Sequence, residues 1–272
     1  MNRVVAISCL GVMLILAITL VSMIERFYDT EKSSIDIVVA RYNEDLDWLC
    51  SDEIRNIISG YGMIKTTIHI YNKGINNVNP KFMECYNNIV DLHVVQLPNV
   101  GRCDHTYLHH IITNYNSLAD VTVFLPASCD MEEKSKKVSY IFNKVYQDVD
   151  TVFMNDGQGS NEFSDFSLTE WGSSHEANQI NGDDALELAN PRPFGDWFRH
   201  IFDEDVFNIP VLTYLGIFAI SRTHILNRDI SFYTSLIGHV DKHHNPEAGH
   251  YLERSWGTIF QVPPERMFSG SH

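Results

Sequence analysis

Apolar residues in the first half of the chain come in two spacings. Residues 35–40 and 121–125 are short runs rich in β-branched residues, each followed by a polar or proline residue, which is typical of buried strands. Residues 104–115 instead place their apolar side chains three and four positions apart, which predicts an amphipathic helix. Strands that alternate with helices predict a mostly parallel sheet with helices on both faces.

The same reasoning places the remaining elements. We expect further strands at residues 66–71 and 93–97 and a helix at residues 46–59. In the second half, residues 211–220 have a strand-like pattern, and residues 231–240 and 247–260 have helical patterns. The sequence therefore predicts a single α/β domain over residues 35–265.

The N-terminus does not share this pattern. From Val4 to Ile24 the chain has 21 residues without a charged side chain. As a helix that rises about 1.5 Å per residue, this segment would span a hydrocarbon core of roughly 30 Å. We therefore expect residues 1–3 to be a short tail, 4–24 an uncleaved membrane anchor and 25–34 a stalk, with a further tail at 266–272. Arg3 precedes the apolar span, which favours a single-pass type II topology under the positive-inside rule.

This topology places the C-terminal domain on the far side of the membrane. We expect a lumenal domain in the Golgi or the endoplasmic reticulum, or the equivalent side of a cell or viral membrane. The four cysteines outside the anchor leave the compartment open, because they could form two disulfides or stay reduced. They are Cys50, Cys85, Cys103 and Cys129.

The balance of charge excludes one class of partner. The chain has 20 Lys and Arg against 35 Asp and Glu, a formal net charge of −15. Binding of nucleic acid needs clustered cations to neutralise phosphates, so we expect no nucleic-acid partner. With 44% hydrophobic and 11% aromatic residues, the sequence also has enough apolar material for a packed core.

Polar and glycine residues follow the predicted strands. In open parallel sheets, ligands bind outside the carboxyl ends of the strands. Cations at these ends could neutralise an anionic group such as a diphosphate. The residues that we expect to line such a ligand site are Arg41, Asn43, Glu44, Lys73, Asn99, Gly101, Arg102 and Ser128.

A set of segments resembles a known family. The chain contains, in this order, VVARYNEDLDWL, IYNKG, PNVGR followed by HTYLHHI, VTVFLPAS, GIFAISR and EAGHYLERSWGTIF. Over residues 35–262 this set resembles the family known as domain of unknown function 3431. More distantly, the polar turn after the first strand, the Asn-x-Gly loop, and the helix and strand that follow resemble, in their order, the GT-A glycosyltransferases.

The GT-A resemblance implies a fold and an activity. It implies a Rossmann-type, mostly parallel sheet, with residues 35–150 as the nucleotide-binding half and residues 151–265 as the acceptor half. The ligand site at the strand ends would then hold a nucleotide-sugar donor. The resulting hypothesis is a membrane-anchored transferase of hexosyl-type groups that moves a sugar to a glycan or lipid-linked acceptor.

The last of these segments suggests catalytic residues. Glu247, Tyr251 and Arg254 fall on the first, fifth and eighth positions of the motif Glu-Asp-x-Asp-Leu-x-x-Arg that the GT-A resemblance implies. The usual base position of that motif is Ala248. Because an inverting transfer needs a carboxylate to deprotonate the acceptor hydroxyl, we expect Glu247 to act as base, oriented by Arg254, with Glu253 as the alternative.

The resemblance also implies a metal ion, Mg²⁺ or Mn²⁺, at an Asp-x-Asp motif. Here only Asp130 follows the fourth strand, and one carboxylate is a poor site for ions that prefer several oxygen ligands. Two other functions stay open. His105, His109 and His250 could hold Zn²⁺ in a hydrolase, since three protein ligands and a water make a catalytic zinc site. The chain could also be a non-catalytic, membrane-tethered binding or structural protein.

Overall fold

The computed structural model describes residues 34–60, 64–86, 89–147, 150–155, 164–168, 186–203, 213–263 and 267–269. The predicted anchor and nearly all of the predicted stalk lie outside this part of the chain. Within it, no helix has both the length and the apolar character needed to cross a bilayer.

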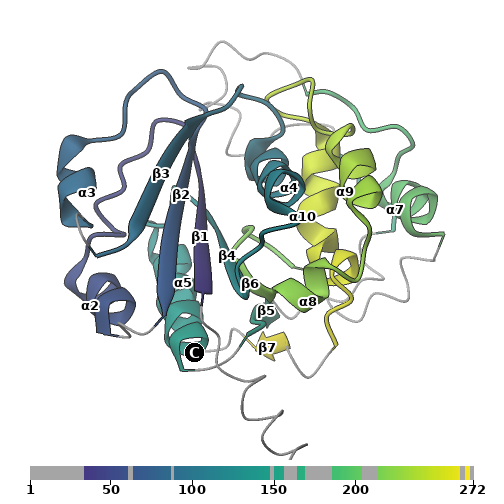
Figure 1. Cartoon of the computed structure of the whole chain (residues 1–272). Coiled ribbons are helices and arrows are strands. Elements are labelled where there is room, and N and C mark those ends of the chain that lie inside the picture. The colour runs from purple at the N-terminus through teal and green to yellow at the C-terminus, as the bar shows by residue number, and fades with distance from the viewer. Residues whose placement is uncertain are drawn as a thin grey trace, which may run out of the picture. The chain divides into compact units, whose positions relative to one another are not determined.

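Among the described residues, the central sheet has five strands (Figure 1). Its order is β3-β2-β1-β4-β6. The first four strands in this order are parallel, and β6 runs antiparallel to β4. The mostly parallel α/β sheet predicted from the sequence is therefore confirmed. The strands are β1 (Ser34–Arg41), β2 (Lys65–Asn72), β3 (Asp91–Gln96), β4 (Val121–Pro126) and β6 (Phe218–Ser221).

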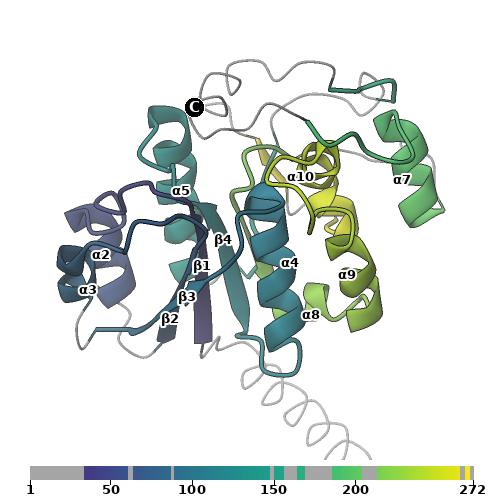
Figure 2. The same cartoon turned by 90° about the horizontal axis from the view of Figure 1, so that it is seen from above.

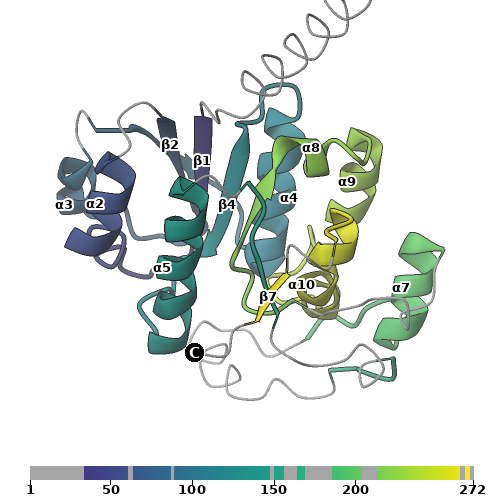
Figure 3. The same ribbon diagram turned by 90° about the horizontal axis from the view of Figure 1, so that it is seen from below.

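Helices cover both faces of this sheet (Figures 2 and 3). One face carries α2 (Asp52–Gly60), α3 (Pro80–Cys85) and α5 (Glu132–Tyr146). The other face carries the remaining helices, and α4 lies directly against β1 and β4. They are α4 (Arg102–Asn114), α7 (Phe194–Phe202), α8 (Arg222–Ile225), α9 (Ile230–Ile237) and α10 (Glu247–Ile259).

Alternation along β1 explains the two hydrophobic layers. Ile35, Ile37 and Val39 belong to the core on the side of α2 and α5, whereas Val38 and Ala40 belong to the core on the side of α4 and α10. Successive side chains of a strand point to opposite faces, so a strand covered on both faces is apolar almost throughout. Burial of one valine or isoleucine side chain contributes roughly 1.5–3 kcal/mol relative to exposure.

Three element boundaries differ from the sequence prediction. The helix expected at residues 46–59 begins at Asp52, and Leu46 and Leu49 are buried in the turns before it. Of the strand expected at residues 211–220, only the end belongs to a strand, β6. Residues 267–269, expected in the tail, form β7 (Met267–Ser269), which pairs in parallel with β5 (Phe153–Asn155). These boundaries are set by pairing between segments that are distant in the sequence, and a local hydrophobic pattern does not encode such pairing.

The strand order reverses between β1 and β4. From β1 the chain continues to β2 and β3 on one side, and it then returns to β4 on the other side. Trp48 Nε1 donates a hydrogen bond to the carbonyl of Ala127 at 2.7 Å, which ties the segment after β1 to the end of β4. Open α/β sheets bind ligands at the carboxyl ends beside such a switch point.

One disulfide joins Cys50, just before α2, to Cys85 at the end of α3. Cys103 and Cys129 are free thiols. Among the four described cysteines, the pairing that the sequence left open is therefore one bridge, from the turn before α2 to the end of α3.

Candidate functional site

A pocket of about 130 Å³ lies where β1 and β2 end. Three of the residues predicted to line a ligand site belong to it, and the others come from the segment after each strand. Amide and carboxylate side chains therefore dominate its wall. The lining residues are Arg41, Asn43, Glu44, Asp45, Leu46, Asn76, Asn77 and Asn79.

Arg41 holds the two strand exits together. Its Nε donates to the carbonyl of Glu44 at 2.8 Å, and its Nη1 donates to Asn72 Oδ1 at 2.6 Å and to the carbonyl of Asn76 at 2.8 Å. The backbones approach so closely here that a Cβ at Gly74 would lie 1.7 Å from the carbonyl oxygen of Tyr42. Only glycine fits at this position.

The turn after β1 is closed by its own side chains. The Glu44 carboxylate accepts the amide hydrogens of Tyr42 and Asn43, at 2.7 and 3.1 Å. Asn43 Oδ1 accepts the amide hydrogen of Asn76 at 3.1 Å. These two predicted site residues therefore shape the pocket wall and fix its backbone.

Lys73 lies at the same edge but is buried. Its Nζ donates to the carbonyls of Val100, at 2.5 Å, and Arg102. Burial lowers the pKa of Lys73 to about 8, while Cys103 and Asp104 partly oppose this shift. Lys73 thus binds the loop before α4, and the predicted contact with a diphosphate is replaced by contacts with backbone carbonyls.

The start of α4 is also closed. Gly101 has φ +60°, and a Cβ there would lie 2.2 Å from the carbonyl oxygen of Val240. Its amide donates to the carbonyl of His243 at 2.7 Å, and the amide of Arg102 donates to that of His244 at 3.3 Å. Helix N-termini bind anions through such amides. Here the loop before α10 occupies them, which corrects the prediction of a diphosphate cradle at this point.

Arg102 faces α10. Its Nη1 lies 2.6 Å from Nε2 and 2.9 Å from Nδ1 of His250. Burial, followed by the charges of Arg102 and Arg254, lowers the pKa of His250 to about 2. Because Arg102 Nη1 lies within hydrogen-bonding distance of both ring nitrogens, this arrangement does not suit a metal ligand.

The predicted zinc set is not assembled. His105 and His109 stack with ring centroids 6.2 Å apart on α4, while His250 contacts Arg102. Burial lowers the pKa of His105 to about 4. In the part of the chain that the structure describes, no group of three or more His, Cys, Asp or Glu side chains could hold a metal ion. The described residues thus correct the zinc alternative.

The β4 exit does not fit Mg²⁺ or Mn²⁺ either. Asp130 is exposed in the turn after β4, and among the described residues it belongs to no group of three or more His, Cys, Asp or Glu side chains that could hold a metal ion. Ser128 Oγ accepts a hydrogen bond from Lys134 Nζ at 2.6 Å. Asn99 is exposed in the loop before α4. None of these three predicted residues lines the pocket of Arg41.

Glu247 is completely buried and serves the fold. Its carboxylate accepts the amide hydrogens of Leu168 and Ala189, at 2.6 and 2.9 Å, and pairs with Arg192 at 3.0 Å. Because both oxygens already accept hydrogen bonds in the interior, they cannot reach an acceptor hydroxyl. The prediction of Glu247 as base does not fit this arrangement.

Glu253 and Arg254 are fixed in a similar way. Glu253 Oε1 accepts the amide hydrogen of Leu215 at 2.8 Å. Arg254 Nη1 donates to the carbonyl of His250 at 2.8 Å, and its guanidinium lies 4.1 Å from the ring centroid of Phe166. In the described contacts Arg254 therefore does not orient Glu247. Its guanidinium instead packs on Phe166, a residue of another segment.

Sequence reasoning missed the buried acid at the start of α4. Asp104, in the first turn of α4, accepts a hydrogen bond from Trp256 Nε1 at 2.9 Å. Burial, followed by the nearby charge of Glu253, raises its pKa to about 7. An acidic residue in the first turn of a helix is so common that the sequence offers no signal for this burial.

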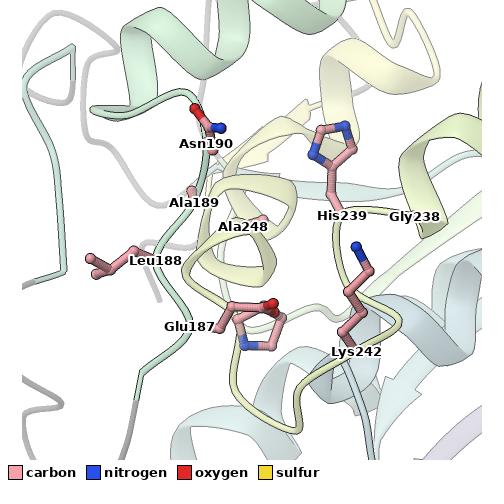
Figure 4. Close-up of a pocket in the computed structure, with 9 residues that line it drawn as sticks. Glu187, Leu188, Ala189, Asn190, Gly238, His239, Lys242 and Ala248 are labelled. Carbon is pink, nitrogen blue, oxygen red and sulfur yellow. The ribbon is translucent and has the colours of Figure 1, made fainter.

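A second pocket of about 150 Å³ lies at the start of α10 (Figure 4). It was also missed, because residues 187–190, the end of α9 and the start of α10 meet only in the fold. Figure 4 shows Glu187 and Lys242 extending into the same region, with His239 and Ala248 beside it. The remaining lining residues are Leu188, Ala189, Asn190, Gly238 and Pro246.

Hydrogen bonds connect the two pockets along one edge of the sheet. The amide of Lys73 donates to the carbonyl of Arg41, and its Nζ donates to that of Arg102. Arg102 in turn contacts the loop before α10, and the amide of Glu187 donates to the carbonyl of Asn245 at 3.3 Å. We call this row, from Arg41 through Lys73, Arg102 and Asn245 to Glu187, the edge seam.

Comparison with protein families decides the membership of the chain. The model of the family described as protein of unknown function (DUF3431) matches residues 37–268. The chain belongs to this family. Comparison of this DUF3431 chain with curated proteins found no match.

Solved structures similar to this DUF3431 chain come from bacteria and a fungus. S. aureus TarS (1–349) is 11% identical at a TM-score of 0.31, covering 71% of this chain and 48% of that chain. Glucosyl-3-phosphoglycerate synthase from Mycobacterium tuberculosis, in complex with Mn²⁺, UDP-Glc and phosphoglyceric acid, is 11% identical at a TM-score of 0.33. The match covers 70% of this chain and 57% of that chain. Core-mannan synthase A from Aspergillus fumigatus, in an Mn/GDP form, is 10% identical at a TM-score of 0.39. The match covers 88% of this chain and 73% of that chain.

The DUF3431 chain spans about half the length of the TarS chain. Likenesses of this degree do not carry the activities of those proteins over to this chain. The pockets and the edge seam are therefore the basis for a function.

Proposed function

We propose that this chain is a glycosyltransferase that moves a sugar from a nucleotide-sugar donor to a glycan or lipid-linked acceptor. The observation that carries the proposal is the polar pocket at the ends of β1 and β2, beside the switch point of the sheet. The exit of β1, which lines this pocket, also borders the switch point, and open α/β sheets bind ligands at the carboxyl ends of the strands beside such a point. The motif order that resembles the GT-A glycosyltransferases agrees with this assignment.

The pocket suits the nucleoside end of a donor. Asn76, Asn77 and Asn79 line it, and each amide offers both NH₂ donors and a carbonyl acceptor. The edge of a nucleobase presents the complementary groups. Asp45 adds a carboxylate that can accept hydrogen bonds from ribose hydroxyls.

Arg41 is the cation that we assign to the diphosphate. It lines the pocket, and its Nη2 makes no hydrogen bond within the described part of the chain. Lys73 and Arg102 are directed into the edge seam instead. Because three hydrogen bonds hold Nε and Nη1 in place, the two N–H groups of Nη2 are preorganised to donate to phosphate oxygens.

We further propose that residues 4–24 anchor the chain in a membrane, with the α/β domain in the lumen of the Golgi or the endoplasmic reticulum. The uncharged N-terminal span supports the anchor. The Cys50–Cys85 disulfide supports an oxidising compartment, where such bridges persist.

The test is binding of nucleoside diphosphates to the full-length chain in detergent. Addition of UDP, GDP, UDP-Glc or UDP-GlcNAc should raise the melting temperature, because a ligand that binds only the folded state stabilises it by mass action. At a ligand concentration of 100 times Kd the gain is about 2.7 kcal/mol. The absence of any shift with all four ligands, at millimolar concentrations, would contradict the proposal.

A matched pair of variants locates the site. Asn77→Trp fills the pocket and should abolish the shift in melting temperature. Ile75→Trp places the same side chain two residues away, at a position that is 93% exposed and does not line the pocket, and should leave the shift unchanged. Equal shifts in both variants would place the ligand elsewhere.

One observation favours a second candidate function. Glu247, Glu253 and His250 are all engaged in internal contacts, as expected for a non-catalytic protein that only binds a nucleotide or sugar. This candidate predicts the same shift in melting temperature but no transfer or hydrolysis of any nucleotide sugar.

A further inference from the structure

We propose that the pocket at the start of α10 receives the acceptor hydroxyl and that Glu187 is its general base. This inference rests on the proposed transferase function and adds a second subsite to it. Sequence patterns gave no indication of this residue, because its segment has no motif. The proposal follows from a comparison of the carboxylates along the edge seam.

Four other carboxylates near the seam are committed to the fold. Glu247 accepts three hydrogen bonds in the interior, Glu253 accepts one from the amide of Leu215, and Glu44 closes its own turn. Asp104 is buried against Trp256. None of these four lines the pocket at the start of α10. They therefore do not meet a hydroxyl that enters it.

Glu187 differs from these four residues, because it lines the pocket and its carboxylate is not engaged by the described part of the fold. Its side chain is half-buried and lines the pocket, and its carboxylate accepts no hydrogen bond from the residues that the structure describes. Its backbone, by contrast, is held firmly: its amide donates to Asn245, and its carbonyl accepts the amide hydrogen of Glu247 at 2.8 Å. A fixed backbone that presents an unengaged carboxylate to a cavity is the geometry that a general base needs.

The neighbours of Glu187 suit a hydroxyl-bearing ligand. Lys242 and His239 line the same pocket and come from the loop between α9 and α10 (Figure 4). Burial lowers the pKa of His239, so the ring is neutral near pH 7 and can both donate and accept. An ammonium, an imidazole and a carboxylate together can hold several hydroxyls of one sugar ring while one hydroxyl faces the base.

The step balances as a direct displacement. Glu187 takes the proton of the acceptor hydroxyl, and the oxygen forms a bond to the anomeric carbon of the donor. The bond from that carbon to the diphosphate oxygen breaks, and the nucleoside diphosphate leaves with the electron pair. The edge seam links the donor pocket to this one through hydrogen bonds, and the proposal places the donor sugar along the seam, between Arg41 and Glu187.

The experiment measures release of nucleoside diphosphate by the full-length chain. UDP-Glc, UDP-GlcNAc and GDP-mannose serve as donors, with water or simple methyl glycosides as acceptors. Glu187→Gln should lower kcat by about 100-fold or more, the usual contribution of a general base. Glu187→Asp should retain part of the activity. The shift in melting temperature with UDP should not change, because Glu187 lies outside the nucleotide pocket.

Glu53→Gln is the matched control, since this exposed carboxylate lies on α2 away from both pockets, and it should leave the rate unchanged. A Glu187→Gln rate within about threefold of the original chain would overturn the base assignment, since general-base removal costs far more. Nucleotide binding without turnover for any donor would also overturn it, while the nucleotide site would survive. If the unmodified chain binds none of these nucleotides, the result would instead contradict the proposed function itself.

Discussion

The two pockets at the carboxyl edge of the sheet differ in how their charges are used. At the ends of β1 and β2, the charged and amide side chains build their own turns and still leave groups facing the cavity. By contrast, Lys73 after β2, and Arg102 and Glu247 at the starts of α4 and α10, point inward and meet protein partners. A charged side chain at this edge of the sheet thus either lines a ligand pocket or holds a neighbouring loop in place through hydrogen bonds. A charged residue at the end of an element occurs in both cases, so the local pattern does not tell them apart.

The largest effect is expected where the two strand exits touch. Gly74→Ala should destabilise the fold by about 3 kcal/mol, the upper range for overpacking, because the new Cβ would meet the backbone of Tyr42 rather than a movable side chain. Urea denaturation followed by circular dichroism measures this loss. Gly60→Ala is the control, since nothing lies within 4 Å of its Cβ position, and it should be neutral or slightly stabilising. Equal stability of the two variants would show that the close approach is not as described.

The second effect tests the inward-facing charges. Glu247→Gln should cost about 2–3 kcal/mol, since it leaves Arg192 without its buried partner and weakens two backbone hydrogen bonds. The same change at Glu253, whose partner Arg254 has further contacts, should cost less than about 1 kcal/mol. Urea denaturation of both variants checks the order. A stable but inactive Glu247→Gln chain would restore that residue as the base.

A third effect concerns pH. The folded pKa of Asp104 is raised to about 7 from 3.8, so the folded state holds a proton that the unfolded state has lost. Folding stability from this group is therefore complete below pH 3.8 and is lost as the pH rises towards 7. Asp104→Asn should remove this loss. Relative to the original chain, the variant should gain about 2 kcal/mol between pH 5 and pH 8. A constant difference across this range would contradict the shifted pKa.

The sequence contained most of the fold. Uninterrupted apolar runs such as residues 121–125 define strands covered on both faces, and the run at residues 35–40 was placed to within one residue of β1. The strand β6 was placed too early, because only its pairing with β4 determines where it starts. Likewise, Leu46 and Leu49 are spaced as in a helix but are buried in turns, where Trp48 is tied to the end of β4.

The candidate site was predicted only in part. Arg41, Asn43 and Glu44 line a pocket because they follow directly after a strand, and their position needs no long-range information. Glu187 and Ala248 are 61 positions apart and meet only when residues 187–190 pair with the start of α10. Whether Glu247 points inward or outward depends on that same pairing. The helical spacing of residues alone does not encode this pairing.

The central claim is that a nucleotide occupies the pocket at the ends of β1 and β2. Hydrogen exchange of the full-length chain with and without UDP tests it most directly, because bound ligand slows the opening of the backbone that it contacts. The account predicts slower exchange in residues 41–46 and 76–79, with little change in α5 on the opposite side of the central sheet from α4. Unchanged exchange in residues 41–46 and 76–79 at saturating UDP, or slower exchange confined to other segments, would contradict it.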